Sequence, residues 1–425
     1  MRIQSSSERQ RSFMKINLDY IARVEGEGSV ELEMQDGKVN GLRLNIWEPP
    51  RFFEGFLRGR KFDEVPDIVA RICGICPVSH MITAIRAIEN AVGFTPSQEI
   101  VKLRRTMALS QIMSSHVVHL YVLVLPDYHR LDMISGLEKE GLRLVRMKEA
   151  LNNITAAFGG RALHPVAMVA GGFTKVVSDD VTGKLIKGLE AIKSDAFETL
   201  KMLSALDIPS FEAETEYVAL SGAEGFDVDN GVITSDLGLK AGEHEYEDYF
   251  EESEIPYSNA KRTIVKGRGP LMVGALSRLN LNFARLHPEA RRAASEAGFR
   301  PPVKNPFMNI IAQAIEIIHG IFQCIDLLEG TGGKEIFFEI EPKEGSGAAV
   351  TEAPRGLLYH RYLLNRRGVV ERANIVTPTA HNSFSMEKAL RGFVSENADL
   401  PKEEMARRCG MLVRAWDPCF SCSVH

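Results

Sequence analysis

The N-terminal part of the chain alternates apolar and polar residues in a pattern typical of strands. Over residues 16–46, turn signals at Gly26, Gly28 and Asp36-Gly37 interrupt this alternation, and together they predict a small antiparallel sheet. Two stretches further on, residues 218–237 and 261–276, also look like strands. A second β region is expected before the C-terminus, at residues 335–341, 356–364 and 369–376.

Between these regions the apolar positions follow helical spacing, which predicts helices over residues 97–125, 181–206, 288–297 and 306–328. Pro126 is expected to stop the first helix, and Gly330 with Gly333 to end the last. The two longest helices are expected to form a bundle at the centre of the protein. An acidic, tyrosine-bearing run at residues 243–254 predicts a solvated lobe.

The pattern as a whole indicates a single α+β domain over residues 14–425. This domain is expected to be rich in helices, with a central bundle of long helices and small peripheral β-sheets. Residues 1–13 are polar and contain three consecutive serines, so they are expected to form a disordered or extended N-terminus. They lack the apolar core of a secretory signal.

Composition narrows the class of protein further. The chain has 425 residues, of which 44% are hydrophobic, and this is ample for a substantial core. A net charge of -5 provides no basic excess for nucleic acid or an anionic membrane surface. The best candidate for a membrane span, residues 117–126, contains His119 and is too short to cross a bilayer. We therefore expect a cytoplasmic protein without a membrane span.

Four of the six cysteines form two C-x-x-C pairs, Cys73 with Cys76 and Cys419 with Cys422. Six cysteines are too few for a secreted disulfide framework, and thiolates suit zinc, copper(I), nickel and iron–sulfur centres. A structural zinc site and a thioredoxin-like redox pair are the alternatives. Zinc ribbons usually separate their pairs by about 15–20 residues. Here 342 residues lie between the pairs, so a joint site closes only when the C-terminal segment docks against an early helix.

The residues around both pairs extend into longer motifs. Residues 71–80 read R-x-C-G-x-C-x-x-x-H, and residues 417–425 read D-P-C-x-x-C-x-x-H. These motifs resemble the paired signatures of nickel–iron hydrogenase large subunits, and the resemblance runs from about residue 16 to residue 425. Further motifs of that family are present at Arg23-Val24-Glu25-Gly26, Gly160-Arg161 with His164-Pro165, Glu352-Ala353-Pro354-Arg355-Gly356 and Val376-Thr377-Pro378-Thr379.

The resemblance implies an enzyme that reversibly cleaves H2 to protons and electrons at a nickel–iron centre. Cys73 and Cys419 would bind nickel terminally, and Cys76 and Cys422 would bridge nickel and iron. The iron would carry carbon monoxide and two cyanide ligands. Cys419 would also serve as a base, because coordination adjusts the basicity of a thiolate.

Further site residues follow from the same resemblance. Arg355 and Thr379 match the donors to cyanide, since a guanidinium and a hydroxyl are good partners for a buried anion. Pro354 and Pro378 would shape the wall of the pocket, and Arg355 is also the basic group above the metals. Judged without the motif, Arg355 would equally suit a buried ion pair with Glu352.

Glu25 matches the first proton carrier of the family, because a carboxylate shuttles protons when burial brings its pKa towards working pH. Judged alone, Glu25 in a polar turn would more often be an exposed surface acid. A magnesium ion is implied as well, with Glu54, the backbone carbonyl of Ile375 and the imidazole of His425 as ligands. Because the resemblance implies proteolytic removal of an extension after the last motif, a chain ending at His425 is expected to be the mature form.

Histidines outside the last motif have simpler interpretations. His116 and His119 are expected to be satisfied core residues, and His80 to hydrogen-bond a cysteine sulfur. The chain departs from many respiratory members at Ser115, Glu27 and His381, where Asp, His and Trp are common. These departures resemble the soluble, cofactor-coupled branch of the family.

The chain is not expected to work alone. Cys324 and Cys409 are too few to hold an iron–sulfur cluster, so a separate iron–sulfur small subunit is required to take the electrons. By resemblance, a flavin-containing diaphorase reacting with NAD(P), a deazaflavin or ferredoxin would follow. Two other hypotheses are a quinone-binding subunit of respiratory complex I, which lacks the four cysteines, and a non-catalytic zinc scaffold, which leaves Arg355 and Glu25 unexplained.

Overall fold

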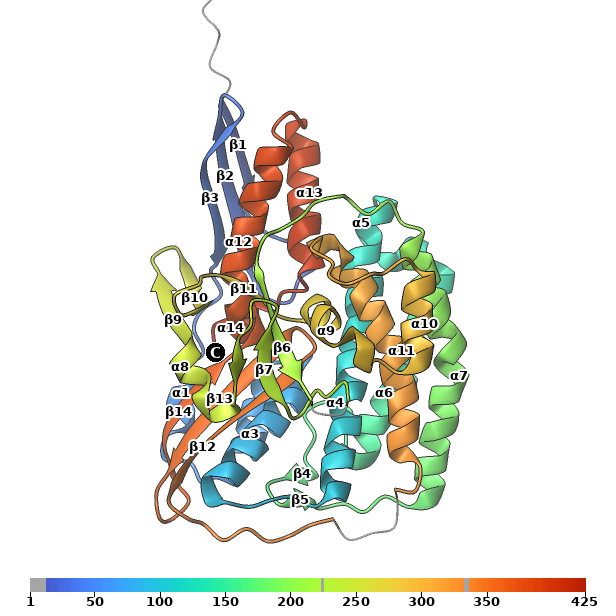
Figure 1. Ribbon diagram of the computed structural model, residues 1–425, viewed down its shortest axis with the longest axis vertical. Coiled ribbons are helices and arrows are strands. Elements are labelled where there is room, and N and C mark those ends of the chain that lie inside the picture. Colours follow the sequence, from blue (N-terminus) through green and yellow to red (C-terminus); the bar gives the residue numbers. More distant parts are fainter. Residues whose placement is uncertain (1–12, 223–224, 332–335) are drawn as a thin grey trace, which may run out of the picture.

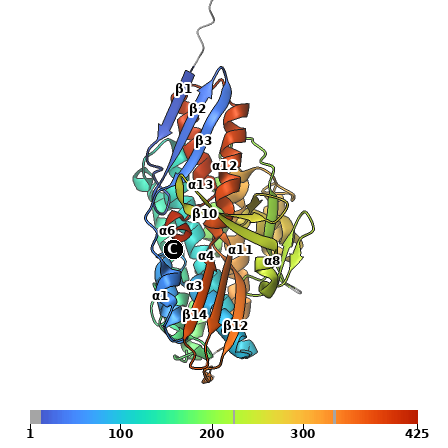
Figure 2. The ribbon, with the colours of Figure 1, turned by 90° about the vertical axis from the view of Figure 1, so that its left-hand side faces the viewer.

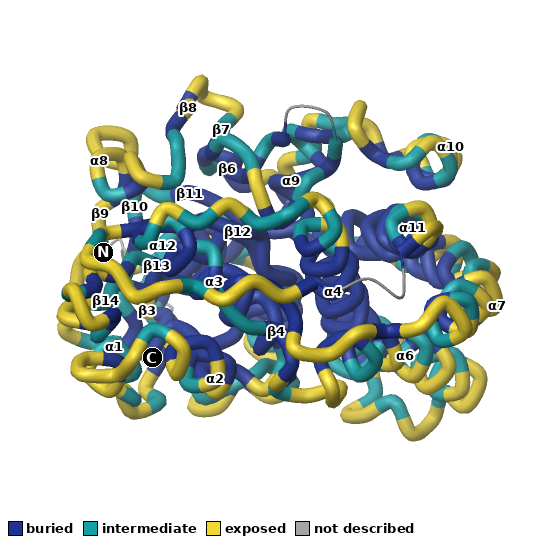
Figure 3. The backbone as a smooth tube through the Cα atoms, turned by 90° about the horizontal axis from the view of Figure 1, so that it is seen from below, coloured by how far each residue is buried: buried dark blue, intermediate teal, exposed yellow. Residues whose placement is uncertain are grey.

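Four long helices pack side by side in the computed structural model, which describes residues 13–222, 225–331 and 336–425. They are α4 (Gln98–Val118), α6 (Glu138–Gly159), α7 (Asp179–Ser204) and α11 (Asn309–Leu328) (Figure 1). Seen from below in Figure 3, α4 and α11 are buried, whereas α6 and α7 carry exposed residues at the margin. The helix-rich α+β class and the central bundle are confirmed.

The helical stretches Gln98–His129 and Pro306–Leu328 are long and apolar enough to cross a membrane, by length and composition. Inside the fold, however, 83% and 78% of their most apolar windows are buried against other parts of the protein. Their apolar surface is therefore already covered by the chain's own core, as expected for central helices of a packed domain.

The first long helix does not stop at Pro126, contrary to the prediction. Ser97 caps α4, whose helical path continues through a π-helical stretch, η2 (His119–Val124), into α5 (Leu125–His129). The N–H of Leu125 donates to the carbonyl of Leu120 in this wider turn. Pro126 then lies in the first turn of α5, where its missing N–H costs nothing. The helix ends instead at Arg130, which adopts a left-handed conformation.

Two three-stranded antiparallel sheets lie at opposite ends of the molecule, and the C-terminus lies between them (Figures 1 and 2). The predicted N-terminal sheet is confirmed as β1 (Phe13–Leu18), β2 (Gly28–Gln35) and β3 (Lys38–Ile46). Asp36 and Gly37 form the β2–β3 turn with positive φ angles of 52° and 76°. The expected disordered start falls mostly on residues 1–12, which lie outside the described residues; Phe13 begins β1.

The second sheet contains β12 (Gly345–Ala353), β13 (Gly356–Leu364) and β14 (Val370–Val376), which confirms two of the three late segments. The third was wrong as a strand: within described residues 336–341 the only pairing is an isolated bridge between Phe337 and Gly172. Helix α3 (Pro77–Val92) packs on this sheet. A Cβ on Gly347 would lie 2.2 Å from the carbonyl oxygen of Ala87, so glycine allows this close approach.

The middle of the chain forms a mixed sheet and a hairpin. Residues 218–237 contain two strands, β6 (Glu216–Ser221) and β7 (Val232–Ser235), joined in one sheet with β8 (Lys240–Ala241) and β11 (Leu271–Met272). Residues 261–276 contain the end of β10 (Ser258–Val265), then β11 and the start of α9 (Ala275–Asn282).

The acidic run at residues 243–254 is only partly the solvated lobe that was predicted. It forms a helical turn, η4 (Glu243–Glu245), helix α8 (Tyr246–Tyr249) and strand β9 (Phe250–Ile255). Tyr246 is buried, stacks on Tyr359 with ring centroids 4.0 Å apart, and its hydroxyl lies 2.6 Å from Nε2 of His381. The acidic residues mask an aromatic anchor.

The remaining elements cover the site or the bundle. Pro306 opens a short turn, η6 (Pro306–Met308), ahead of α11, and Gly330 with φ of 72° follows it; Gly333 lies outside the described residues. The other described elements are α1 (Phe53–Leu57), α2 (Val65–Val69), η1 (Ala70–Ile72), η3 (Ile134–Gly136), β4 (Met168–Val169), β5 (Gly172–Phe173), η5 (Phe283–Arg285), α10 (Pro288–Glu296), α12 (Pro378–Glu396), α13 (Lys402–Ala415) and α14 (Phe420–Ser423).

Candidate metal centre

The two C-x-x-C pairs meet in one buried cluster. Cys73 and Cys76 lie between η1 and α3, and Cys419 and Cys422 lie at the start of α14 and within it. The sulfurs of Cys73 and Cys419 are 3.6 Å apart, and those of Cys76 and Cys422 are 3.8 Å apart. These separations exceed a disulfide bond but match the edge of a tetrahedron, about 3.8 Å, that thiolates form around a metal with bonds of about 2.3 Å.

The charge state of the cluster also suits a cation. Hydrogen bonds from Cys419 and Cys422 lower the pKa of the Cys73 thiol well below its ordinary value. Burial raises the pKa of Cys419 and Cys422 well above theirs. The protein alone therefore stabilises one negative charge among these sulfurs. A bound metal ion would supply the positive charge that holds the remaining thiols deprotonated.

Arg51 joins the segments that carry the two pairs, and the sequence reasoning did not single it out. Its Nη2 donates to the carbonyls of Ile72, at 2.6 Å, and Ser421, at 2.5 Å. Its backbone N–H donates to the carbonyl of Val424 at 2.8 Å. Two of these three acceptors lie beyond Cys419, so Arg51 fixes the C-terminal segment against the residues that precede Cys73.

The loop after β1 approaches the same segment from the other side. The carbonyl of Glu25 accepts from the N–H of Phe420 at 2.8 Å, and Gly26 follows with φ of 85°. A Cβ on Gly26 would lie 2.6 Å from the backbone nitrogen of Ser421. Only glycine permits both this conformation and this approach, which brings the Glu25 side chain to the cluster.

Glu25 is partly buried and contacts the cluster directly. The Cys419 thiol donates to its Oε2 at 2.8 Å, and the N–H of Ser421 approaches the same oxygen at 3.3 Å. Burial raises the pKa of Glu25 above its ordinary value, and the negative charge of Cys73 raises it further. Its surroundings are those of a proton-exchanging acid, not of an exposed surface carboxylate.

Arg355 follows β12 and reaches the cluster from the opposite wall. Its Nη2 pairs with Oδ1 of Asp417 at 2.9 Å, and its Nε donates to the Asp417 carbonyl at 2.7 Å. Its Nη1 is buried without a hydrogen-bond partner anywhere in the described ranges. Such an atom requires an acceptor, so the pocket has room for a buried anion beside the sulfurs.

The alternative ion pair between Arg355 and Glu352 is not formed, because another arginine occupies Glu352. Nη1 of Arg278, on α9, donates to Glu352 at 2.9 Å and to the carbonyl of Ala353 at 3.0 Å. Arg278 also pairs with Glu316 of α11 at 2.7 Å. This buried network anchors the hairpin that presents Arg355.

Thr379 and the two prolines complete the pocket wall. The Thr379 hydroxyl accepts from the N–H of Cys419 at 2.9 Å, and its own proton is left to donate elsewhere. Pro378 is the first residue of α12, where its fixed φ suits the helix start. The carbonyl of Pro354 accepts from Arg278 at 3.1 Å. Pro354, Pro378 and Thr379 are all buried.

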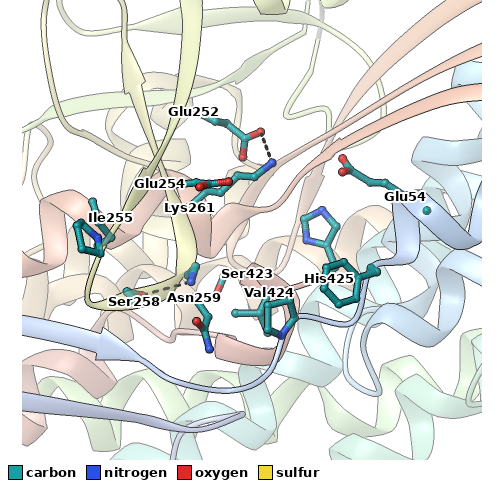
Figure 4. Close-up of a pocket in the computed structure, with 15 residues that line it drawn as sticks. Glu54, Glu252, Glu254, Ile255, Ser258, Asn259, Lys261, Ser423, Val424 and His425 are labelled. Carbon is teal, nitrogen blue, oxygen red and sulfur yellow. Dashed lines mark hydrogen bonds and ion pairs between the residues drawn. The ribbon is translucent and has the colours of Figure 1, made fainter.

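A second group of candidate ligands meets near the C-terminus. Nε2 of His425 lies 2.8 Å from the carbonyl oxygen of Ile375, whose N–H donates to Oε1 of Glu54 at 2.8 Å. A pocket opens beside them, and Figure 4 shows His425 and Glu54 facing it across from Lys261 and Glu252. A carboxylate, a carbonyl and an imidazole from three distant segments form a donor set that suits a hard cation.

The other histidines separate into two groups. His116 and His119 are satisfied core residues, as predicted: His116 faces Glu316 at 2.8 Å, and His119 lies 2.7 Å from the carbonyl of Arg414. The predicted bond from His80 to a cysteine sulfur is not formed. Its Nδ1 faces His360 instead, and burial lowers the pKa of His80 to about 3.

Comparison with known proteins agrees with this geometry. The family described as nickel-dependent hydrogenase matches residues 51–141 and 317–425. The alpha subunit of sulfhydrogenase 1 from Pyrococcus furiosus is 36% identical, over 97% of this chain and 98% of that protein. A subunit of the F420-non-reducing hydrogenase from Methanothermobacter thermautotrophicus is 29% identical, over 97% of this chain and 95% of that protein.

Solved structures extend the likeness to the whole fold. An NAD+-reducing [NiFe]-hydrogenase in the H2-reduced state superimposes with a TM-score of 0.86 and 27% identity, covering 97% of this chain and 99% of that chain. A [NiFeSe]-hydrogenase of Dm. baculatum, 22% identical, shares the fold with a TM-score of 0.80, covering 97% of this chain and 100% of that chain. The chain belongs to the nickel-dependent hydrogenase family, as the large, catalytic subunit of such an enzyme.

Proposed function

We propose that this subunit cleaves H2 at a nickel–iron centre held by its four clustered cysteines. Cys73 and Cys419 are the terminal nickel ligands, and Cys76 and Cys422 bridge nickel to an iron that carries carbon monoxide and two cyanides. The observation that carries the proposal is the buried cluster of four sulfurs facing the unpartnered Nη1 of Arg355. A zinc scaffold needs the sulfurs but has no use for that guanidinium nitrogen.

When bound, the metals polarise H2 so that it separates into two electrons and two protons. The residues of this chain would then manage the anions and the protons. Arg355 and the Thr379 hydroxyl donate hydrogen bonds to the cyanides, while Pro354 and Pro378 keep the wall apolar and exclude water. Arg355 also places a positive charge beside the sulfurs, which favours their thiolate form.

Proton transfer runs from the Cys419 thiol to Glu25. The two groups share a 2.8 Å hydrogen bond, short enough for direct transfer without a bridging water. Because burial raises the pKa of Glu25, the carboxyl group both accepts a proton and releases it near neutral pH. Glu25 is thus the first carrier on the way to solvent.

A magnesium ion would bind the carboxylate of Glu54, the carbonyl of Ile375 and the imidazole of His425. The proposal is supported by their convergence and by the oxygen-rich donor set. The ion would join α1, β14 and the C-terminal residue. Since His425 follows Cys422 by three residues, this link would hold the second cysteine pair in place.

An iron–sulfur small subunit is the proposed partner, on the face next to Cys73. Large apolar side chains are exposed there, including Phe52 at 68% and Leu163 at 51%. Both neighbours are tied to the turn before Cys73: Arg51 donates to Ile72, and His164 contacts the carbonyl of Ala70 at 2.9 Å. Electrons would leave the centre by this short route.

The electron acceptor is proposed to be soluble, reached through a flavin-containing diaphorase in the cytoplasm. The whole-chain likeness to an NAD+-reducing hydrogenase supports NAD(P) as the acceptor. Relatives named as F420-non-reducing hydrogenases and sulfhydrogenases leave ferredoxin and deazaflavin as candidates within the same class. Activity with each acceptor, measured on the complex purified with its partners, separates these candidates.

The test of the centre itself combines metal analysis with infrared spectroscopy of the purified complex. One nickel and one iron per chain, with one carbonyl band and two cyanide bands, are expected. Zinc alone, or a nickel-containing active complex without those bands, would contradict the assignment. A Cys76→Ser variant should lose the bands, whereas Cys324→Ser, which removes a buried thiol far along α11, should retain them.

A further inference from the structure

A chain of three buried side chains begins beside the cysteine cluster and has no part in the mechanism above. His80 lies in the first turn of α3, and its Nδ1 is 3.2 Å from Nε2 of His360 on β13. The Nδ1 of His360 is in turn 2.7 Å from the hydroxyl of Tyr362. All three side chains are completely buried. The chain connects a helix that begins next to Cys76 to the sheet behind it.

The far end of this chain is closed. Within residues 13–222, 225–331 and 336–425, the Tyr362 hydroxyl has no hydrogen-bond partner besides His360. Glu54 is the charged group that acts on Tyr362, but its Oε1 is occupied by the N–H of Ile375. A buried hydroxyl with one partner donates its proton to that partner, because an undonated O–H would stay unsatisfied.

This donation sets the direction of the whole chain. Nδ1 of His360 accepts from Tyr362, so the single proton of that neutral ring lies on Nε2. The Nε2–H of His360 then donates to Nδ1 of His80. The proton of His80 consequently lies on its own Nε2, which makes this nitrogen a donor.

The Nε2 of His80 is the open end. It is buried without a hydrogen-bond partner in the described part of the chain. Among charged groups, Cys73 acts most strongly on the ring, ahead of His425 and Arg51, and it alone favours positive charge there. An N–H donor without an acceptor is costly to bury, and thiolates are the anions within its reach.

We propose that Tyr362 and His360 are positioning residues that hold His80 as an Nε2–H donor towards the cysteine sulfurs. The inference rests on the proposed function, because metal-bound thiolates carry the lasting negative charge that this donor meets. A hydrogen bond to a thiolate withdraws electron density from the sulfur and therefore from the metal it binds. The three residues thus raise the reduction potential of the centre without touching it.

The test is Tyr362→Phe in the purified complex. Phe keeps the ring but removes the donor, so His360 no longer has a fixed tautomer. More electron density should remain on the metals, so the carbonyl band should move to lower wavenumber and the reduction potential should become more negative. Turnover should fall about tenfold, the lower end for a residue supporting a metal ligand, while nickel and iron contents stay unchanged.

Three further variants make the result specific. His360→Leu should shift the band in the same direction. His360→Gln can still accept from Tyr362 with its carbonyl oxygen and donate to His80 with its amide, so its band should return towards that of the wild type. Tyr359→Phe removes a buried hydroxyl from the same strand that does not contact His360, and its spectrum should not change.

A second readout needs no activity. Nitrogen-15 spectra of the histidine-labelled complex should give His80 with its proton on Nε2 in the wild type and a mixture in Tyr362→Phe. Unchanged bands and unchanged tautomers in fully loaded Tyr362→Phe and His360→Leu would overturn the inference. A wild type with the expected tautomer but without nickel or a carbonyl band would overturn the proposed function and leave the positioning chain standing.

Discussion

Two side chains from opposite walls act on the same sulfur. Glu25 accepts a hydrogen bond from Cys419, while Arg355 is tied to Asp417, two residues before that cysteine. Asp417 has a φ of 50°, an unusual value for a residue other than glycine, and a third residue, Gln313 of α11, donates to its Oδ2 at 3.0 Å. These bonds hold the turn that places Cys419 between an acid and a base.

The acid is tested by Glu25→Gln. The amide keeps the size of the side chain but cannot carry a proton, so nickel and iron should be retained while H2 oxidation falls about 10²–10⁴-fold. Metal analysis and turnover on the same preparation measure both effects. Glu27→Gln, two residues along the same loop, is the matched control and should keep full activity. Unchanged turnover in Glu25→Gln would remove Glu25 from the proton path.

The guanidinium is tested by Arg355→Lys, which keeps the positive charge. An ammonium group cannot bond both to Asp417 and to a ligand in the pocket, whereas the planar guanidinium presents five donors. Turnover should fall about 100-fold or more, and the cyanide bands should shift. Arg361→Lys, on neighbouring β13 with Glu247 as its partner, should change neither. Normal cyanide bands in Arg355→Lys would contradict the assigned contact.

At the scale of elements, the β12–β13 hairpin is held from below by charge. Arg278 of α9 lies between Glu316 of α11 and Glu352 of β12, and all three side chains are buried. Arg278 also bonds the carbonyls of Ala353 and Pro354. One arginine therefore joins a core helix to the residues immediately before Arg355, and the hairpin cannot move without breaking a buried ion pair.

This network predicts a pH-dependent stability. Burial alone would raise the pKa of Glu316, but the charge and hydrogen bonds of Arg278, with His116, lower it to about 2. An unfolded glutamate titrates near about 4.3. The stabilisation is therefore complete above that pH and is lost as the pH falls towards 2.

Glu316→Gln should lower the free energy of unfolding by about 3–5 kcal/mol at pH 7, because Arg278 loses its partner in the core. The difference from the wild type should shrink below about pH 4. Denaturant unfolding at pH 7 and pH 3 measures both values. Glu329→Gln, at the exposed end of the same helix, should have little effect at either pH. A constant difference at both pH values would contradict this account.

The elements also mark how far local sequence predicts structure. Alternation and helical spacing predicted both outer sheets and the long helices, since each buries one continuous face. Pro126 misled because its effect depends on the π-helical stretch before it, which tertiary packing sets. The acidic run misled because one buried aromatic, Tyr246, outweighs its charged neighbours. Residues 336–341 are apolar enough for a strand, yet only Phe337 pairs.

The candidate site was more predictable than its supports. The cysteines, Glu25, Arg355 and His425 belong to motifs, so their sequence context marks them. Arg51, Gln313 and Arg278 lie in ordinary contexts, and only the folded chain brings them to the site. Arg51 lies close to Glu54 in the sequence, but nothing local indicates that it reaches Ser421, 370 residues away.

At the scale of the molecule, early and late parts of the chain meet in the centre. The loop that begins at Gly26 and the turn before Cys73 enclose the last residues of the chain, and the sheets lie on either side (Figure 2). The C-terminal segment therefore occupies a slot formed entirely by earlier parts of the sequence. A metal bound by both pairs would stabilise this closed arrangement, because it binds only the folded form.

Protein produced without nickel should therefore have a looser C-terminal segment. Backbone amides of residues 417–425 should exchange hydrogen faster than in the loaded protein, because the cluster then lacks its central cation. Hydrogen exchange followed by mass spectrometry measures the difference. Strands β12 and β13, held by the Arg278 network, should exchange equally in both samples. Equal protection of residues 417–425 would show that Arg51 and Glu25 suffice to hold the segment.

The wide separation of the two cysteine pairs also has a consequence in time. Chains are synthesised at about 5–20 residues per second, so Cys419 emerges roughly 20–70 s after Cys76. During that interval the first pair has no partner sulfurs, although the helices around it are already able to fold. A chain interrupted anywhere before Cys419 cannot build the four-sulfur cluster at all. The centre thus reports that translation has passed the second pair, and no shorter product can imitate the finished enzyme.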